Sequence, residues 1–295
     1  MVDNDIFVNE MQWAIENTPR EFPESVNVAC QGTEGSNSQE AVKKLFRAPN
    51  IMYFSSFEAV FNAIEMGLCK YGVIPLENST AGSVNSVYDL MIQYEFYIVR
   101  STRIRIEHNL IAKYGVGLED IREILSHEQA ISQCSKFLST LENVRVLPLE
   151  NTAFAAREVA MSDRNDMAAI ASKACIKLYD LNCILSGIQN NDNNYTRFIC
   201  ISKKLEIYPG ANRTSLMVIL PHEPGSLYRF LSPLNDKGIN LLKLESRPLP
   251  GREFEFMFYF DIETSVYSSR LSELLDMLPM ECEEFRYLGS YSEII

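Results

Sequence analysis

The chain has 295 residues, of which 46% are hydrophobic, so it is long enough to bury about two hydrophobic cores. Its net charge of -12 argues against nucleic acid as a ligand, because that affinity depends on basic groups that meet phosphate. Seven cysteines without a Cys-x-x-Cys pair, and three histidines far apart in sequence (His108, His127 and His222), predict reduced thiols and no metal site.

Residues 1–25 predict a polar arm with a short helical segment around residues 11–16, which Pro19 and Pro23 end. The acidic start of the arm is not typical of a secretory signal. No apolar run in the chain approaches the roughly 18 residues that a membrane span needs. We therefore expect a cytoplasmic protein without a membrane partner. Trp13 could pack on a neighbour, but the sequence does not decide the role of the arm.

Short β runs alternate with helical patterns from residue 26 onward. Strands are expected at residues 26–30, 51–54 and 71–76, and helices over residues 41–46 and 60–68. This alternation is typical of a largely parallel sheet with helices on both faces.

The loop at residues 31–38 joins the first strand to its helix and contains two glycines and several hydroxyl side chains. Such a loop lets the backbone approach an anion closely. It lacks the lysine of a P-loop and the third glycine of a dinucleotide fingerprint, so nucleotide binding is not expected. Ser38 is the candidate ligand contact in this loop.

Polar residues Glu77, Asn78 and Ser79 follow the third strand. Asn78 can offer a donor and an acceptor at the strand end, where open α/β sheets bind their ligands; alternatively, Glu77 and Asn78 only tie down a turn. Residues 73–79 and 146–152 have nearly the same sequence, offset by 73 residues. The repeat is either a coincidence of strand-to-helix sequences or a sign of two similar lobes that face each other across a cleft.

The sequence Ser126-His127-Glu128-Gln129 has the form of a capping box, with Ser126 as the expected N-cap of a helix. Gln129 and Gln133 would lie one turn apart on the same helical face. The motif is either a helix cap alone or a cap whose N–H groups also face an anion. His127 is a secondary candidate for a general acid, because histidine is the usual side chain for proton transfer at physiological pH.

The sequence Asn194-Tyr195-Thr196-Arg197-Phe198 stands where a polar loop becomes an apolar strand. A hydroxyl and a guanidinium at this point are well placed to face a ligand cleft, although the same residues could merely open an edge strand. Arg197 is expected either to bind a carboxylate or to form a structural ion pair. Phe198 is expected to pack the floor of the cleft.

A second domain is expected at residues 213–290, in the order βαββαβ that is typical of a ferredoxin-like fold. Its first helix carries an apolar stripe that includes Phe230 and Leu234, with Pro233 expected to bend it and Gly238 to end it. Pro250-Gly251 predicts a turn before a strand with phenylalanine at every second position from residue 254 to 260. That strand predicts a sheet face and edge which a second copy can cover, hence a homodimer or homotetramer.

Four motifs together resemble the prephenate dehydratases: Glu77-Asn78-Ser79, Ser126-His127-Glu128-Gln129-Ala130, Asn194-Tyr195-Thr196-Arg197-Phe198 and Glu245-Ser246-Arg247-Pro248. The resemblance covers residues 26–288. It implies a catalytic domain at 26–205, similar in architecture to type II periplasmic binding proteins. The first lobe would comprise 26–103 and 184–205, the inserted second lobe 104–183, and the C-terminal domain would resemble an ACT regulatory domain.

The resemblance implies a carbon-oxygen lyase that converts prephenate to phenylpyruvate in phenylalanine biosynthesis without a cofactor. Alternatives are an arogenate dehydratase and a catalytically silent phenylalanine-binding regulator. Asn37, Glu128 and Asn190 depart from the usual pattern. Some relatives carry a fused chorismate mutase, and the arm is too short to encode one. The residues implied as catalytic are Thr196, Asn78, Ser126 and Gln133, and those implied as substrate-binding are Ser38, Glu77, Ser79, His127, Arg197 and Phe198.

Phenylalanine is the expected allosteric effector. A glycine turn at a helix N-terminus suits its carboxylate, and a carboxylate at the end of the next strand suits its ammonium group. His222 and Ser226 depart from the usual motif, so the affinity or selectivity for phenylalanine could differ. The implied effector residues are Gly225, Ser226, Leu227, Glu245, Ser246 and Arg247.

Overall fold

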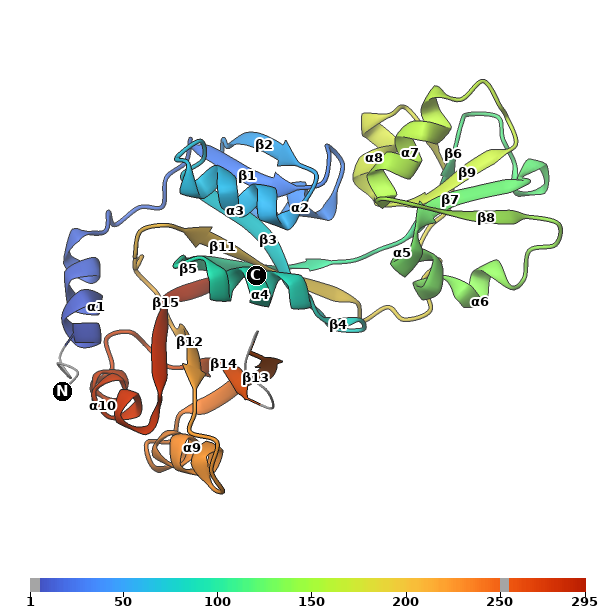
Figure 1. Ribbon diagram of the computed structural model, residues 1–295. Coiled ribbons are helices and arrows are strands. Elements are labelled where there is room, and N and C mark those ends of the chain that lie inside the picture. Colours follow the sequence, from blue (N-terminus) through green and yellow to red (C-terminus); the bar gives the residue numbers. More distant parts are fainter. Residues whose placement is uncertain (1–5, 250–254) are drawn as a thin grey trace.

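The computed structural model describes residues 6–249 and 255–295. The strands in these residues form two β-sheets (Figure 1). One sheet has ten strands and the other has five. Helices pack on both sheets, so the two-lobed α/β class expected from the sequence is confirmed. Within the described residues, no helix is long and apolar enough to cross a membrane.

The first lobe contains β1 (Asn27–Gln31), α2 (Asn37–Leu45), β2 (Asn50–Phe54), α3 (Phe57–Glu65), β3 (Tyr71–Asn78), β4 (Gly82–Ser83), α4 (Asn85–Gln93), β5 (Tyr97–Arg105) and β11 (Tyr195–Ser202). Its strand order is β5-β11-β3-β1-β2, in which β1, β2 and β3 are parallel. Strand β11 is antiparallel to β3 and β5 and joins this sheet after the chain has passed through the second lobe. Its register places Thr196 opposite Asn78.

The second lobe contains β6 (Asn109–Ala112), η1 (Leu118–Asp120), β7 (Glu123–His127), α5 (Glu128–Gln133), α6 (Ser135–Leu138), β8 (Arg145–Leu149), α7 (Thr152–Met161), β9 (Met167–Ala171), α8 (Lys173–Leu178) and β10 (Asn182–Leu185). Its strand order is β10-β6-β9-β7-β8. Two connections between the lobes run side by side, because Ile106 N donates to Asn194 O (2.8 Å) and Ile188 N to His108 O (2.9 Å). The two lobes lie at either end of these connections (Figure 1).

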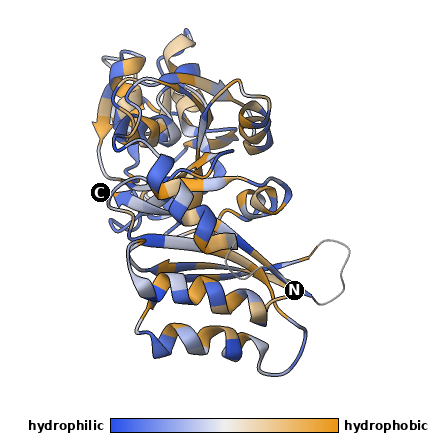
Figure 2. Cartoon of the chain, turned by 90° about the vertical axis from the view of Figure 1, so that its left-hand side faces the viewer, coloured by the Kyte–Doolittle hydropathy of each residue, from blue (hydrophilic) through white to orange (hydrophobic). Residues whose placement is uncertain are grey.

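The C-terminal domain contains β12 (Arg213–Ile219), α9 (Ser226–Asp236), β13 (Asn240–Pro248), β14 (Phe256–Glu263), α10 (Ser269–Met277), η2 (Leu278–Glu281) and β15 (Glu284–Ile294). The expected βαββαβ order is confirmed, with Pro233 inside α9. Both long helices lie on the same side of the sheet (Figure 2), where Phe230 and Leu271 are completely buried. The expected turn at Pro250-Gly251 and Phe254 lie outside the described residues.

Strand β15 joins the first lobe and the C-terminal domain into one sheet. It continues to Ile294, past residue 290, where the sequence analysis placed the end of the second domain, and pairs in parallel with β5 from Ser292 to Ile294. Gly289 is required at the passage between the two neighbours: its φ is 121°, and a Cβ there would lie 2.5 Å from the carbonyl oxygen of Ile98. The sequence did not predict this extension, because the polar residues after 288 interrupt the apolar pattern that is typical of a strand.

The interface between these two units is a hydrophobic core. Tyr88 on α4 packs edge-on against Tyr259 of β14, with the ring centroids 4.9 Å apart. Met217, Met257 and Leu288 of the C-terminal domain belong to the same buried cluster. Close packing of this kind fixes the two units relative to one another.

The N-terminal arm forms a helix, α1 (Ile6–Asn17), that is longer than the segment predicted from the sequence. It packs on the C-terminal domain, where Met11 and Ala14 are buried among the core residues of α9 and α10. The rings of Phe7 and Phe285 are 5.0 Å apart. Trp13 does not take part in this packing, because 63% of its surface is exposed.

Candidate active site

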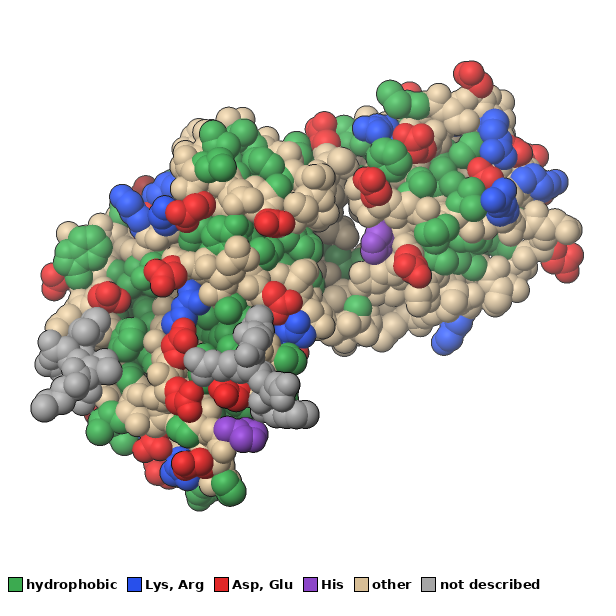
Figure 3. All heavy atoms as spheres, in the orientation of Figure 1, with side chains coloured by type: hydrophobic (Ala, Val, Ile, Leu, Met, Phe, Trp, Pro, Cys, Tyr) green, Lys and Arg blue, Asp and Glu red, His purple; other side chains and the backbone are tan. Residues whose placement is uncertain are grey.

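A cavity of about 520 Å³ lies between the two lobes and is lined by residues of both. Figure 3 shows the surface hollowed between the lobes in this view. The lining includes Ser38, Asn78, Thr196 and Phe198 from the first lobe, and His127 and Gln133 from the second. The structure thus brings six of the ten predicted catalytic and substrate-binding residues to one cavity.

The repeated sequence at 73–79 and 146–152 occupies equivalent places on the two lobes. Asn78 ends β3 on one side of the cavity, while Asn151 and Thr152 follow β8 on the other. Asn151 is the N-cap of α7, and its side-chain oxygen accepts from Phe154 N (2.7 Å). Of the two interpretations of the repeat, the structure therefore supports lobes that face each other. The sequence analysis did not identify Thr152 as a site residue, although it lines the cavity.

Thr196 and Asn78 form the centre of the site. Asn78 Nδ2 donates to Thr196 Oγ1 (2.9 Å) and to Asn194 Oδ1 (2.8 Å). Its Oδ1 accepts from the backbone N–H groups of Thr80 (3.0 Å) and Ala81 (2.9 Å). Both donor hydrogens of Asn78 are thus used within the protein, so it orients Thr196 instead of offering free groups to a ligand. Because Thr196 Oγ1 accepts this bond, its own proton is available to the cavity.

Gln133 connects the second lobe to this centre. Its Oε1 accepts from Asn194 Nδ2 (3.0 Å) and lies 2.8 Å from Nε2 of His108. Its Nε2 donates to Thr80 Oγ1 (3.0 Å) on the first lobe. The sequence analysis did not identify Thr80, His108 or Asn194 as site residues. Asn194 was within a quoted motif, but an isolated histidine between two strands carries no local signal.

The predicted N-cap at Ser126 is wrong, because His127 occupies that position. Strand β7 continues through His127, whose Nδ1 accepts from Gln129 N (3.2 Å). Ser126 is completely buried on the opposite side of the strand, and its hydroxyl donates to Ile170 O (2.7 Å). It does not line the cavity, whereas Gln129 and Gln133 both do, as their spacing predicts.

Arg197 and Glu77 point away from the cavity. Side chains alternate along a strand, so the neighbours of Thr196 and Asn78 face the C-terminal domain. There Arg197 forms a buried ion pair with Asp261 and a second one with Glu77 (3.2 Å). Of the two roles left open for Arg197, the structure supports the structural ion pair. Ser79 is also outside the cavity, where its hydroxyl donates to Asn193 O (3.1 Å).

Lys243 extends this ion-pair network into β13, where its Nζ donates to Glu77 Oε2 (2.7 Å) and to Ser83 Oγ (3.0 Å). Burial alone would raise the pKa of Glu77, but the hydrogen bond from Lys243 and the nearby Arg197 guanidinium outweigh burial and lower that pKa. Glu245 Oε2 accepts from the same Ser83 hydroxyl (2.6 Å). Since Ser83 lines the cavity, the C-terminal domain directly supports one cavity wall.

The predicted effector residues do not line one hollow within the described part of the chain. Ser226 and Leu227 line a hollow of about 140 Å³ with His222 and Phe258. Glu245 instead contacts Ser83, and Arg247 forms a two-pronged ion pair with Asp89 of α4. The Glu245-Ser246-Arg247 motif therefore contacts the first lobe in this structure.

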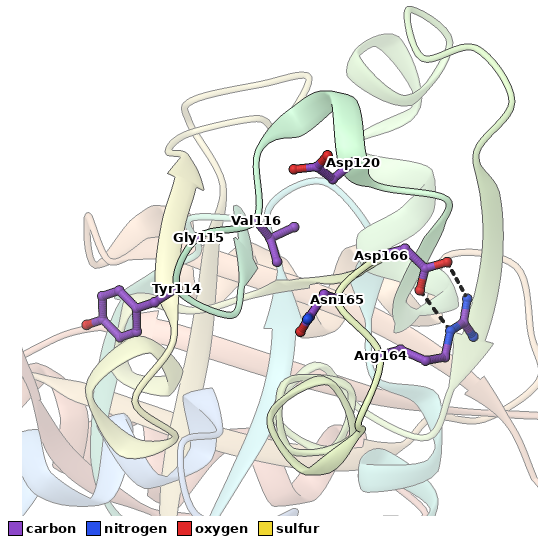
Figure 4. A pocket seen from close by; sticks show the side chains of 7 residues that line it. All are labelled: Tyr114, Gly115, Val116, Asp120, Arg164, Asn165 and Asp166. Carbon is purple, nitrogen blue, oxygen red and sulfur yellow. Dashed lines mark hydrogen bonds and ion pairs between the residues drawn. The ribbon is translucent and has the colours of Figure 1, made fainter.

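A further hollow of about 510 Å³ lies on the second lobe and shares no lining residue with the cavity between the lobes (Figure 4). Arg164 lines it, but its guanidinium is paired with Asp166 (2.8 Å) and Glu123 (2.9 Å). Its charge is therefore compensated by carboxylates, and the hollow has no character of an anion site.

Two α/β lobes around a cavity lined by hydroxyl, amide and imidazole groups are typical of proteins that bind a small polar molecule between their lobes. Residues 28–206 match the family described as prephenate dehydratase. An Arabidopsis thaliana protein named arogenate dehydratase/prephenate dehydratase 2, chloroplastic, is 36% identical over 96% of this chain and 76% of its own length. The chain belongs to the prephenate dehydratase family.

Solved structures agree with this assignment. A prephenate dehydratase from Arthrobacter aurescens, in complex with L-phenylalanine, is 28% identical with a TM-score of 0.82, and the match covers 90% of each chain. GqqA, described as a novel type of quorum quenching acylase, is also 28% identical, with a TM-score of 0.81 over 90% of this chain and 97% of that one. The fold is thus shared with proteins of more than one stated activity.

Proposed function

We propose that this protein catalyses the decarboxylative dehydration of prephenate to phenylpyruvate in the cytoplasm. In this elimination the bond to the ring carboxylate breaks and releases CO₂, its electron pair enters the ring, and the ring hydroxyl leaves as water after taking up a proton. Aromatisation drives the step, so the enzyme must align the two leaving groups and assist the departing oxygen. The observation that carries the proposal is the Thr196 hydroxyl, whose proton Asn78 leaves free for the cavity.

Thr196 supplies a hydrogen bond to the leaving oxygen but is too weak an acid to supply its proton. His127 is the candidate for proton delivery, because its imidazole lines the cavity. Its Nδ1 accepts from Gln129 N in the structure, so delivery requires that the ring first take up a second proton, which releases this bond and gives the imidazolium that can donate to the leaving oxygen.

The charges of the cavity bear on the choice between prephenate and arogenate. Among the described residues that line it there is no lysine or arginine, and Glu150 is the one carboxylate. Helix N-termini supply the positive potential: Ser38 lies in the first turn of α2 and Thr152 in that of α7. The Glu150 carboxylate repels the prephenate dianion but attracts the ammonium group of arogenate. Arogenate is therefore the second candidate substrate.

Side-by-side assays of both substrates test the proposal. Phenylpyruvate formed from prephenate supports it, and failure to convert either substrate overturns it. Glu150→Gln should shift the ratio of the two kcat/KM values toward prephenate, because it removes a negative charge without changing the side-chain size. An unchanged ratio would show that Glu150 does not discriminate between the substrates.

We also propose a homodimer or a larger even assembly. Strand β13 forms one edge of the ten-stranded sheet, and the side chains of Leu244 and Phe256 beside this edge are about 40% exposed. Among the described residues no further strand pairs with this edge, and an edge with exposed apolar side chains favours association with a second copy. Sedimentation should therefore give at least twice the monomer mass of 33.6 kDa, and a monomer at micromolar concentration would contradict this.

Feedback inhibition by phenylalanine is proposed to act through Glu245. An effector ammonium group that engages this carboxylate competes with the Ser83 hydroxyl, which belongs to the cavity wall. With a coupling of the usual size, about 1–3 kcal/mol, phenylalanine should weaken substrate binding roughly 5- to 150-fold. Glu245→Ala should lose this inhibition.

Ser83→Ala is the matched control for that variant. It removes the same contact but leaves the carboxylate in place, so calorimetry should still detect phenylalanine binding while inhibition is weaker. If the parent and Glu245→Ala are inhibited equally, the effector binds in the catalytic cavity instead.

A further inference from the structure

His108 lies in the short connection between β5 and β6, where the chain passes from the first lobe to the second. Its backbone is held by the neighbouring connection, which runs in the opposite direction: its N–H donates to Gln189 Oε1 (3.0 Å), and its carbonyl accepts from Ile188 N (2.9 Å). Only 4% of the residue is exposed, yet it lines the cavity. A buried imidazole at this point contacts the site without being part of any motif found in the sequence.

The side chain of His108 ends a chain of hydrogen bonds whose direction is fixed from the other end. Backbone N–H groups can only donate, so those of Thr80 and Ala81 fix Oδ1 of Asn78 as an acceptor. Asn78 Nδ2 then donates to Asn194 Oδ1, and Asn194 Nδ2 donates to Gln133 Oε1. Each amide orientation follows from the previous one.

The last link of this chain determines the state of His108. Gln133 Oε1 is an acceptor, so the imidazole nitrogen 2.8 Å from it must carry a proton. Burial lowers the pKa of His108, against the opposing effect of the hydrogen bond to Gln133, so the ring is neutral near pH 7. Its single proton therefore sits on Nε2.

This arrangement also leaves one hydrogen of Gln133 Nε2 without a partner among the described residues, because the other is used by Thr80 Oγ1. A rotation of the amide by 180° would place its NH₂ group against two donors, Asn194 Nδ2 and His108 Nε2. His108 and Asn194 together thus fix the orientation of the Gln133 amide, which belongs to a side chain that lines the cavity.

We propose that His108 is a positioning residue of the active site, which fixes the Gln133 amide so that one N–H is presented to the substrate. This inference rests on the proposed function for its effect on turnover, but the hydrogen-bond arrangement itself does not depend on activity. His108 acts through Gln133 and takes no proton from the substrate.

A double-mutant cycle tests the proposal. His108→Leu should lower kcat/KM roughly tenfold, the fold-change that corresponds to the loss of one buried hydrogen bond. In a Gln133→Ala background the same substitution should change kcat/KM less than twofold, because the group that it positions is already gone. Equal losses in the two backgrounds would overturn the proposal.

His108→Gln provides the conservative rescue. Its amide nitrogen reaches about as far as Nε2 and can donate to Gln133 Oε1, so this variant should retain kcat/KM within about threefold of the parent. A loss as large as that of His108→Leu would contradict the positioning role. Circular dichroism and a thermal melt of each variant separate misfolding from mispositioning.

A measurement without substrate keeps the proposal testable if the parent protein is inactive. Long-range ¹H–¹⁵N correlation spectra distinguish the two neutral tautomers, and the chain has only three histidines to assign. His108 should be neutral and protonated on Nε2 at pH 7. The Nδ1-protonated form would overturn the proposal, whereas the Nε2 form in an inactive protein would contradict the proposed function alone.

Discussion

Thr196→Ala should lower kcat by roughly 10²–10³, the usual loss when one hydrogen-bond donor to a transition state is removed. The hydroxyl accepts from Asn78 Nδ2 at 2.9 Å, and it donates to no group among the described residues, so its proton is available to the cavity. Substrate affinity should change little, because the bond strengthens only as the ring oxygen leaves. Steady-state kinetics with prephenate and arogenate, together with direct binding of either substrate, measure both quantities.

Two further substitutions at the same position serve as controls. Thr196→Val keeps the volume but not the hydroxyl, and should be as impaired as the alanine variant. Thr196→Ser keeps the hydroxyl and should be more active than either. If all three stay within a few-fold of the parent, Thr196 is not the assisting group, and the cavity-lining imidazole of His127 becomes the principal candidate.

Local patterns in the sequence were sufficient to predict site residues wherever a single helix or strand determines the position of the side chain. Thr196 and Asn78 stand at the ends of strands whose apolar runs are evident, and the structure pairs them directly. The spacing of Gln129 and Gln133 on one helical face likewise placed both at the cavity. These cases need only the periodicity of a helix or a strand.

Positions that depend on pairing between distant segments could not be predicted in this way. Ser126 and His127 are both able to accept a bond at a helix start, and the choice depends on where β7 ends. That point is set by pairing with β8, in which His127 stands opposite Leu149. Arg197 has its buried partner at Asp261, 64 residues further along the chain in another domain. No local motif encodes such a contact.

The buried ion pair between Arg197 and Asp261 connects strand β11, which carries Thr196, to the C-terminal domain. Asp261 is completely buried, and its carboxylate also accepts from the hydroxyl of Ser215. Arg197 Nη2 donates to Tyr291 Oη at 2.6 Å. Both charges thus have hydrogen bonds besides their own ion pair, which favours the burial of two charges, although Arg197 Nε has no hydrogen-bond partner among the described residues and lies 3.8 Å from Glu293 Oε1.

Asp261→Ala should lower the free energy of unfolding by about 3 kcal/mol, because it leaves a buried guanidinium without its main counter-ion. The expected value is at the lower end for a broken buried pair, since Glu77 remains 3.2 Å and Glu293 3.8 Å from Arg197. Urea unfolding followed by circular dichroism measures the change.

Two comparisons show whether the loss comes from an unpaired charge. The double variant Arg197→Met/Asp261→Leu replaces both charges by apolar groups and should be more stable than Asp261→Ala, because no isolated charge remains. Arg47→Ala breaks an exposed ion pair with Glu24, where 79% of the Arg47 side chain is accessible, and should cost less than about 1 kcal/mol. If Asp261→Ala were no more harmful than Arg47→Ala, the buried pair would contribute no more than a surface one, and the two units would be held together by the shared hydrophobic core around Tyr88 and Tyr259 and by the pairing of β15 with β5.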